Sequence, residues 1–157
     1  LSAIAAPAGL PGRVHSALML QPAVSHLCFA ADADGKGGPG GYRPALDRVT
    51  QPIMTTFSAH DVPLTKVFHL ALRRAGDLGE AHIAADEPPS RYAALGGFGP
   101  RPLGADTRLV DVLDPGTRYR LDGGLQVAGV NGTRTISSHG EVSNPSTWWM
   151  LYDLITR

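Results

Sequence analysis

The sequence is poor in cysteine, in aromatic side chains and in excess charge. Its one cysteine, Cys28, has no second thiol for an internal disulfide, and its apolar neighbours favour a small buried side chain over a reactive thiol. The 14 Lys and Arg residues balance the 14 Asp and Glu residues, so there is no surplus of positive charge to attract nucleic acid. We therefore expect no nucleic-acid partner.

Long hydrophobic runs are also missing. No apolar stretch approaches the ~18 residues of a membrane-spanning helix, so no membrane span is expected. Leu1 to Leu10 is apolar but has neither an initiator Met nor a basic leader, and it does not read as a signal peptide. The expectation is a soluble protein, with the cytoplasm slightly favoured. A chain that opens Leu-Ser-Ala-Ile-Ala-Ala looks cut from something longer.

The composition that is present predicts one loop-rich domain over residues 1–157. The apolar share of 43% can bury a single core, and the 19 glycines and 13 prolines exceed the usual combined share of about 12%. Gly35 to Gly40 fits the string Gly-x-Gly-x-x-Gly, but no strand leads directly into it and Pro39 and Pro44 oppose a following helix. We expect no nucleotide and no other cofactor.

The chain is organised around the stretch from Gln51 to Asp61. Its first part is rich in β-branched and aromatic residues and predicts a buried strand, and the residues from Ser58 to Asp61 predict a loop. Apolar residues then recur at helical spacing from Val62 to Ala75. The unit is a strand, an acidic loop and a helix.

Other segments complete the expected architecture. The nearly continuous apolar run from Val14 to Gln21 is typical of a strand covered on both faces, which predicts an α/β fold with a parallel sheet flanked by helices. The further expected elements are a helix end at Leu1–Ala6, a flexible loop at 30–41, and a long Gly/Pro-rich connection at 77–102 that is either functional or mobile. A short strand or turn is expected at 107–113 and a strand at either 125–130 or 133–136. The closing helix is expected at 146–156, docking through Trp148, Trp149, Leu151, Tyr152 and Ile155.

Polar groups follow two of the predicted strands. Asp61 comes after the second strand and His139 after the third, and parallel strands end at the same edge of a sheet, so the two side chains can meet. A carboxylate bonded to one imidazole nitrogen leaves the other free as a general base. Ser25 and His26 after the first strand, and His60 beside the acid, are expected to line the substrate site. No dedicated metal-ligand spacing is present, so no metal is expected.

Both central residues also have a simpler interpretation. Asp61 precedes a predicted helix and can serve as its N-cap, a role that needs no chemistry and is compatible with catalysis. His139 lies in the polar sequence Ser138-His-Gly140 and can serve turn geometry alone.

Three segments resemble the C-terminal half of an α/β-hydrolase-fold protein. They are Val14-His-Ser-Ala-Leu-Met-Leu-Gln-Pro-Ala-Val-Ser-His26, Pro52-Ile-Met-Thr-Thr-Phe-Ser-Ala-His-Asp61 and Ser138-His-Gly-Glu-Val142. They are similar to the strand and lid-side loop after the nucleophile, to the strand bearing the acid, and to the histidine loop. The order of Asp61 before His139 agrees with that family's order of acid before histidine.

The resemblance implies a serine hydrolase that cleaves an ester, amide or thioester. The family's nucleophile lies in a Gly-x-Ser-x-Gly turn, which this sequence lacks. The serine is therefore expected upstream of residue 1 or on another chain, so that the 157 residues are a fragment, a processed product or one half of a split enzyme, inactive alone. The alternative is a non-catalytic interaction module that retains the hydrolase scaffold and binds a partner through its loops.

Overall fold

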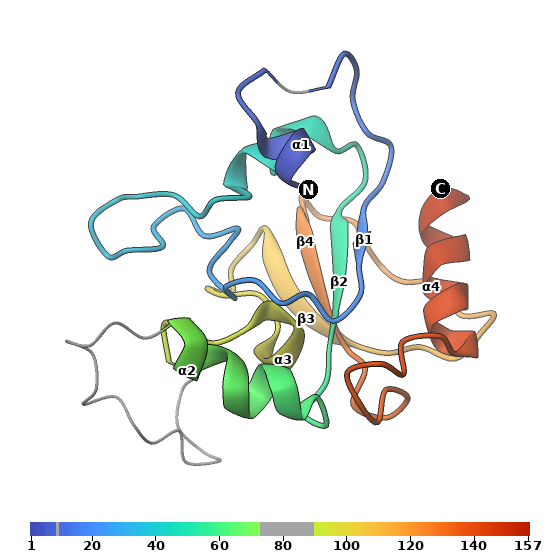
Figure 1. The fold of residues 1–157 in the computed structure, drawn as a ribbon. Coiled ribbons are helices and arrows are strands. Elements are labelled where there is room, and N and C mark those ends of the chain that lie inside the picture. The colour runs from blue at the N-terminus through green and yellow to red at the C-terminus, as the bar shows by residue number, and fades with distance from the viewer. Residues whose placement is uncertain (9, 73–89) are drawn as a thin grey trace.

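A parallel β-sheet forms the centre of the fold (Figure 1). The computed structural model describes residues 1–8, 10–72 and 90–157, and within them the sheet has four strands in the order β1-β2-β4-β3. Their bounds are β1 Leu18–Met19, β2 Ile53–Phe57, β3 Thr107–Asp111 and β4 Val127–Asn131. All three pairings are parallel, so the predicted α/β fold with a parallel sheet is confirmed.

The two central strands, β2 and β4, are apolar and covered on both faces. The first four residues of each strand are buried, which is why each reads as a continuous run without polar alternation. One face packs against α4 (Pro145–Ile155), and the opposite face packs against α1 (Ser2–Ala5) and the 3₁₀-helix η1 (Arg43–Arg48). The sheet is therefore flanked by helices, and its core is split into two clusters.

Three short helical segments lie near the carboxyl ends of the strands (Figure 1). They are the π-helical η2 (Pro63–Val67), α2 (Phe68–Leu72) and α3 (Leu95–Phe98). The first two continue one another and correspond to the predicted helix from Val62, whose last residues, 73–75, lie outside the described residues.

Two expectations about loops and strands were wrong in extent. The predicted strand at 14–21 is reduced to two residues, β1, because Gln21 turns the chain with a φ of 43° and Val14 makes only an isolated bridge to Val49. Within the predicted long connection at 77–102, the described part contains the buried helix α3. Its glycines allow this burial, since a Cβ at Gly96 would come within 2.6 Å of the backbone at Gln21.

The closing helix begins where the sequence indicated, but it docks through a different face. Asn144 caps it by accepting the Thr147 N–H at 3.0 Å. Trp148, Tyr152 and Ile155 are 59%, 52% and 55% exposed, so the prediction that they dock on the sheet was wrong. The helix instead buries Met150 and Leu154 in the core.

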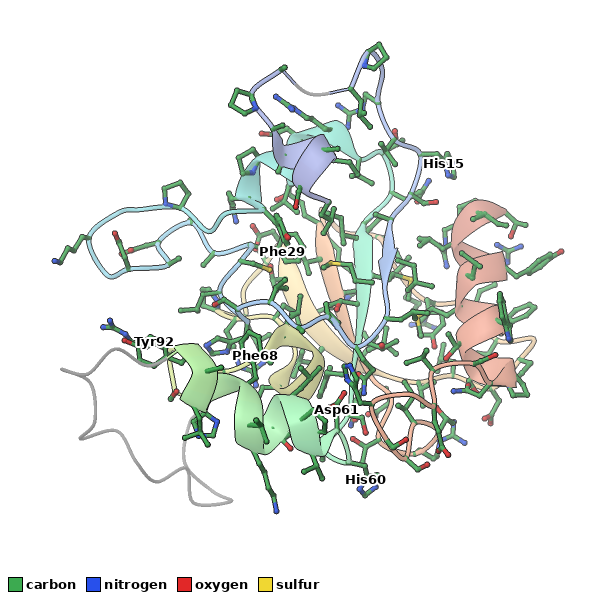
Figure 2. The ribbon with its side chains drawn as sticks, in the orientation of Figure 1. His15, Phe29, His60, Asp61, Phe68 and Tyr92 are labelled. Atoms are coloured by element: carbon green, nitrogen blue, oxygen red, sulfur yellow. The ribbon has the colours of Figure 1, made fainter. Side chains whose placement is uncertain are left out.

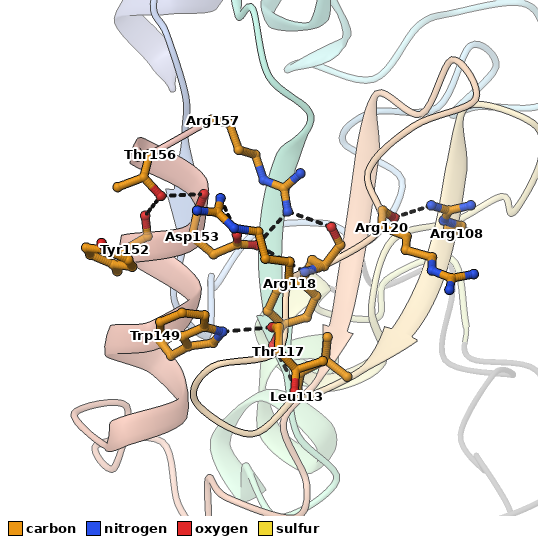
Figure 3. Close-up of polar contacts among 11 residues, drawn as sticks. Arg108, Leu113, Thr117, Arg118, Arg120, Trp149, Tyr152, Asp153, Thr156 and Arg157 are labelled. Atoms are coloured by element: carbon orange, nitrogen blue, oxygen red, sulfur yellow. Dashed lines mark hydrogen bonds and ion pairs between the residues drawn. The ribbon is translucent and has the colours of Figure 1, made fainter.

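Polar contacts between α4 and the segment at 117–119 add to this docking. The Trp149 Nε1–H donates to the Thr117 carbonyl at 2.8 Å (Figure 3). The Asp153 carboxylate accepts hydrogen bonds from the next two residues of that segment, Arg118 and Tyr119. The indole of Trp149 also packs against the core cluster on this face of the sheet.

The remaining expectations about elements are settled by the strand bounds. Of the two alternatives for the third apolar strand, 125–130 is the correct one, since β4 covers Val127–Asn131, and the segment at 107–113 is the strand β3. Among the described residues, no helix is long and apolar enough to cross a lipid bilayer.

Candidate functional site

Asp61 and His139 meet at the carboxyl edge of the two central strands. The strands β2 and β4 are hydrogen-bonded neighbours, with Phe57 opposite Asn131 at their ends. The chain leaves both strands at the same edge, and the loops that follow carry the two side chains. The Asp61 Oδ2 lies 2.7 Å from the His139 Nδ1, which is hydrogen-bonding distance. The expected proximity of these two groups, 78 residues apart in sequence, is therefore present.

Two further hydrogen bonds hold the loops together. The Ser58 Oγ–H donates to the Ile136 carbonyl at 2.7 Å, and the Ala59 N–H donates to the Thr133 Oγ1 at 3.1 Å. Ser58 is fully buried, so its bond is shielded from water. These contacts fix the positions of the two loops independently of the contact between the aspartate and the histidine.

The Asp61 carboxylate both caps the following helix and contacts His139. Its side chain is fully buried, and its Oδ1 accepts the Leu64 N–H at 3.0 Å, as a helix-capping carboxylate does. The backbone carbonyl of Asp61 accepts the Thr65 N–H at 2.8 Å. One carboxylate oxygen thus supports the helix, and the other is left for His139.

His139 is half exposed and contacts Asp61 through one of its two ring nitrogens. Its side chain is 47% exposed, and within residues 1–8, 10–72 and 90–157 its recorded hydrogen bond is the one from Nδ1. An ionised carboxylate only accepts, so we assign the proton to Nδ1. The neutral ring then carries its free lone pair on Nε2, which is the tautomer that a general base requires.

The three residues expected to line the site have different surroundings. His60 is exposed, and Figure 2 shows it at the outer surface beyond Asp61. The Ser25 Oγ accepts the Leu27 N–H at 3.1 Å, and Ser25 lines an open hollow of about 300 Å³ with Cys28 and Tyr42. Within the described residues, none of the three side chains is hydrogen-bonded to the side chain of Asp61 or His139.

His26 is a buried imidazole without a polar partner. It is 3% exposed, and neither ring nitrogen bonds to any residue that the structure describes. Burial, together with the nearby charge of Arg101, lowers the pKa of His26 to about 4. It is therefore neutral at physiological pH.

No nucleophile is poised beside His139 in the described part of the chain. The thiol of Cys28 is buried, and burial raises its pKa to about 12, so the reactive thiolate is not formed at neutral pH. The Ser58 hydroxyl is committed to the Ile136 carbonyl. The described residues likewise contain no group of three or more His, Cys, Asp or Glu side chains placed to share a metal ion.

Sequence reasoning missed one residue at this edge, Gln21. It follows β1, its backbone has a positive φ, and its side chain is buried. No sequence signal indicates this conformation, because glutamine has no preference for it and the Thr56 hydroxyl that accepts its N–H is distant in sequence.

Comparison of the chain with protein-family models, with curated proteins and with solved structures finds no match. The chain contains a small α/β domain with a four-stranded parallel sheet in its described residues.

Proposed function

We propose that the chain supplies the acid and the histidine of a serine-type hydrolase of the α/β-hydrolase kind. The contact of 2.7 Å between the buried Asp61 carboxylate and the Nδ1 of the half-exposed His139 carries this proposal. The buried carboxylate fixes the ring and its tautomer, and Nε2 remains available to a reacting group. The order of the acid before the histidine along the chain also supports it.

The nucleophile in this proposal is a serine from outside the described residues, on another segment or another chain. Its Oγ attacks the carbonyl carbon of an ester, amide or thioester while its proton passes to the His139 Nε2. The tetrahedral intermediate then expels the alcohol, amine or thiol, which takes that proton from Nε2. Water, activated by the same nitrogen, hydrolyses the acyl-enzyme and restores the serine. Asp61 stabilises the imidazolium in both halves of the cycle.

The test compares two histidine variants of the protein expressed at the full length that its gene encodes. His139→Ala is expected to lower kcat/KM for N-acetylglycine p-nitrophenyl ester, an activated ester that also carries an amide group, by about 10³-fold or more, since it removes the general base. His15→Ala is the matched control, because His15 is exposed and lies at the opposite end of the sheet from Asp61 (Figure 2). Unchanged turnover by His139→Ala would contradict the proposal.

A fluorophosphonate probe identifies the missing nucleophile in the same preparations. The labelled serine is expected outside the described residues, and labelling is expected to depend on His139.

One observation favours the alternative of a non-catalytic interaction module: within the described residues no hydroxyl or thiol is bonded to His139. If neither turnover nor labelling occurs in the wild type, that alternative is supported.

A further inference from the structure

Gln21 has a backbone conformation that its residue type disfavours. Its φ of 43° lies in the left-handed region, and it is the one non-glycine residue among those described with a positive φ. A non-glycine side chain is disfavoured in that region, and such residues concentrate at functional sites. The turn is held in place from outside, because the Gln21 N–H donates to the Thr56 Oγ1 at 2.9 Å.

The side chain of Gln21 carries a second unfavourable feature. It is 3% exposed, and neither its amide oxygen nor its amide nitrogen has a hydrogen-bond partner among the described residues. Buried polar atoms are nearly always paired, because leaving one unpaired costs most of its lost hydration. Strain in the backbone and an unpaired amide in the side chain thus coincide at one residue.

The position of Gln21 connects it to the proposed site. It follows β1, which neighbours β2, and Thr56 lies in the penultimate position of β2. The next backbone carbonyl, that of Pro22, accepts the Gly96 N–H, and the Gly96 carbonyl accepts the Ser58 N–H. Gln21 therefore lies at the same carboxyl edge as the loop from Ser58 to Asp61.

We propose that Gln21 is a substrate-binding residue of this site and that it selects substrates carrying an amide group. The inference rests on the proposed function and adds the class of substrate to it. The Gln21 amide offers one acceptor and one donor group, and another amide is the group that satisfies both. An ester has no N–H, so it leaves the buried Gln21 oxygen unpaired, and such a site rejects it.

Binding to the 157-residue chain tests this without any turnover. The two probes are N-acetylglycine N-methylamide and methyl acetoxyacetate, which has the same shape with each amide replaced by an ester. We expect the side-chain NH₂ resonances of Gln21 in ¹⁵N-labelled protein to shift saturably with the diamide and not with the diester. Gln21→Ala, which also assigns these resonances, is expected to weaken diamide binding at least tenfold.

Two further variants separate binding from folding. Gln126→Ala is the matched control, because Gln126 precedes β4 at the opposite end of the sheet, and it is expected to leave diamide binding unchanged. Gln21→Gly keeps the positive φ without strain and removes the unpaired amide, so its thermal midpoint is expected within about 5 °C of the wild type. A much lower midpoint would show that the amide is structural and would overturn the inference.

The failure of this inference is distinguishable from that of the proposed function. Diamide binding needs neither a serine nor His139, so it is expected to persist in His139→Ala. If the diamide binds but no hydrolysis dependent on His139 is detected, the role of Gln21 is supported and the proposed hydrolase function is contradicted. If hydrolysis depends on His139 but the diamide and the diester bind equally well, the proposed hydrolase function is supported and the role of Gln21 is overturned.

Discussion

Two aspartates in this molecule are equally buried and differently paired. Asp61 and Asp153 both have fully buried side chains. Asp153 binds two arginines, with Arg118 Nη1 at 3.0 Å, and it also accepts the Tyr119 N–H at 3.1 Å (Figure 3). Asp61 has one backbone N–H and the imidazole of His139. The single negative charge of Asp153 thus faces two positive charges, whereas the one side-chain partner of Asp61 is a half-exposed histidine.

This difference separates a structural site from a candidate catalytic one. Two guanidinium groups offset the cost of burying the Asp153 carboxylate, and the network joins α4 to the segment at 117–119. The partner of Asp61 is half exposed, and its second ring nitrogen takes no part in the contact with the carboxylate. A buried carboxylate paired with a titratable imidazole contributes less to stability than one paired with two arginines. General-base catalysis requires such a pairing of carboxylate and imidazole.

The largest effect on stability is expected at Asp153. Asp153→Asn leaves two arginines without a counter-charge, of which Arg118 is 54% exposed at its side chain and Arg157 19%. The expected loss in the free energy of unfolding is about 2–3 kcal/mol, since the fully buried side chain at 153 loses its charge-assisted hydrogen bonds to both guanidinium groups. Urea denaturation at pH 7 measures it.

An exposed ion pair provides the control for that measurement. Arg134 and Asp114 are bonded at 2.9 Å with both side chains mostly exposed. Asp114→Asn is expected to change the free energy of unfolding by less than about 1 kcal/mol. Equal losses in the two variants would show that the burial of Asp153 does not determine its contribution.

His26 extends the comparison to a buried ionisable group with no partner in the described chain. Because its folded pKa is about 4 and its unfolded pKa is close to 6.5, the unfolded chain binds more protons between those values. Stability therefore falls as the pH decreases through that range and levels off below pH 4 for this group. The expected contribution is a loss of about 2 kcal/mol between pH 7 and pH 5.

The measurement is urea denaturation at pH 7 and pH 5 in the wild type and in His26→Gln. Glutamine does not titrate, so the variant is expected to lose this part of the pH dependence while other groups contribute equally to both proteins. If the two proteins lose the same stability between pH 7 and pH 5, His26 is not held neutral by the fold.

The sequence was most informative where burial acts on whole segments. The strands β2 and β4 are recognisable because both faces are covered, which leaves runs without charged residues or polar alternation that stop at a polar loop. The closing helix has a local start signal in Asn144 and Pro145. Its docking face was not predictable in the same way, because apolar residues occur all around it and only tertiary packing selects Met150 and Leu154 over Trp148.

The polar residues likewise divide into those that the sequence could predict and those that it could not. Asp61 and His139 could be anticipated because each follows a strand, and parallel strands bring their carboxyl ends together. Gln21 and Asp153 could not, because their roles depend on partners distant in sequence. The Thr56 hydroxyl holds the turn at Gln21, and Arg118 reaches Asp153 from a loop 35 residues away. Local propensity carries no information about such contacts.

The smallest effect on stability is expected at Asp61, and it decides the comparison. In Asp61→Asn the amide oxygen still accepts the Leu64 N–H, since asparagine and aspartate cap helices equally well. His139 is half exposed, so water replaces the lost carboxylate, and the cost of burying a charge disappears. The free energy of unfolding is expected to change by about 1 kcal/mol or less, while hydrolysis by the full-length protein falls by about 10⁴-fold. Urea denaturation and an ester assay on the same preparation measure both quantities. If Asp61→Asn instead loses as much stability as Asp153→Asn and retains activity, the contact with His139 is structural and both aspartates belong to one class.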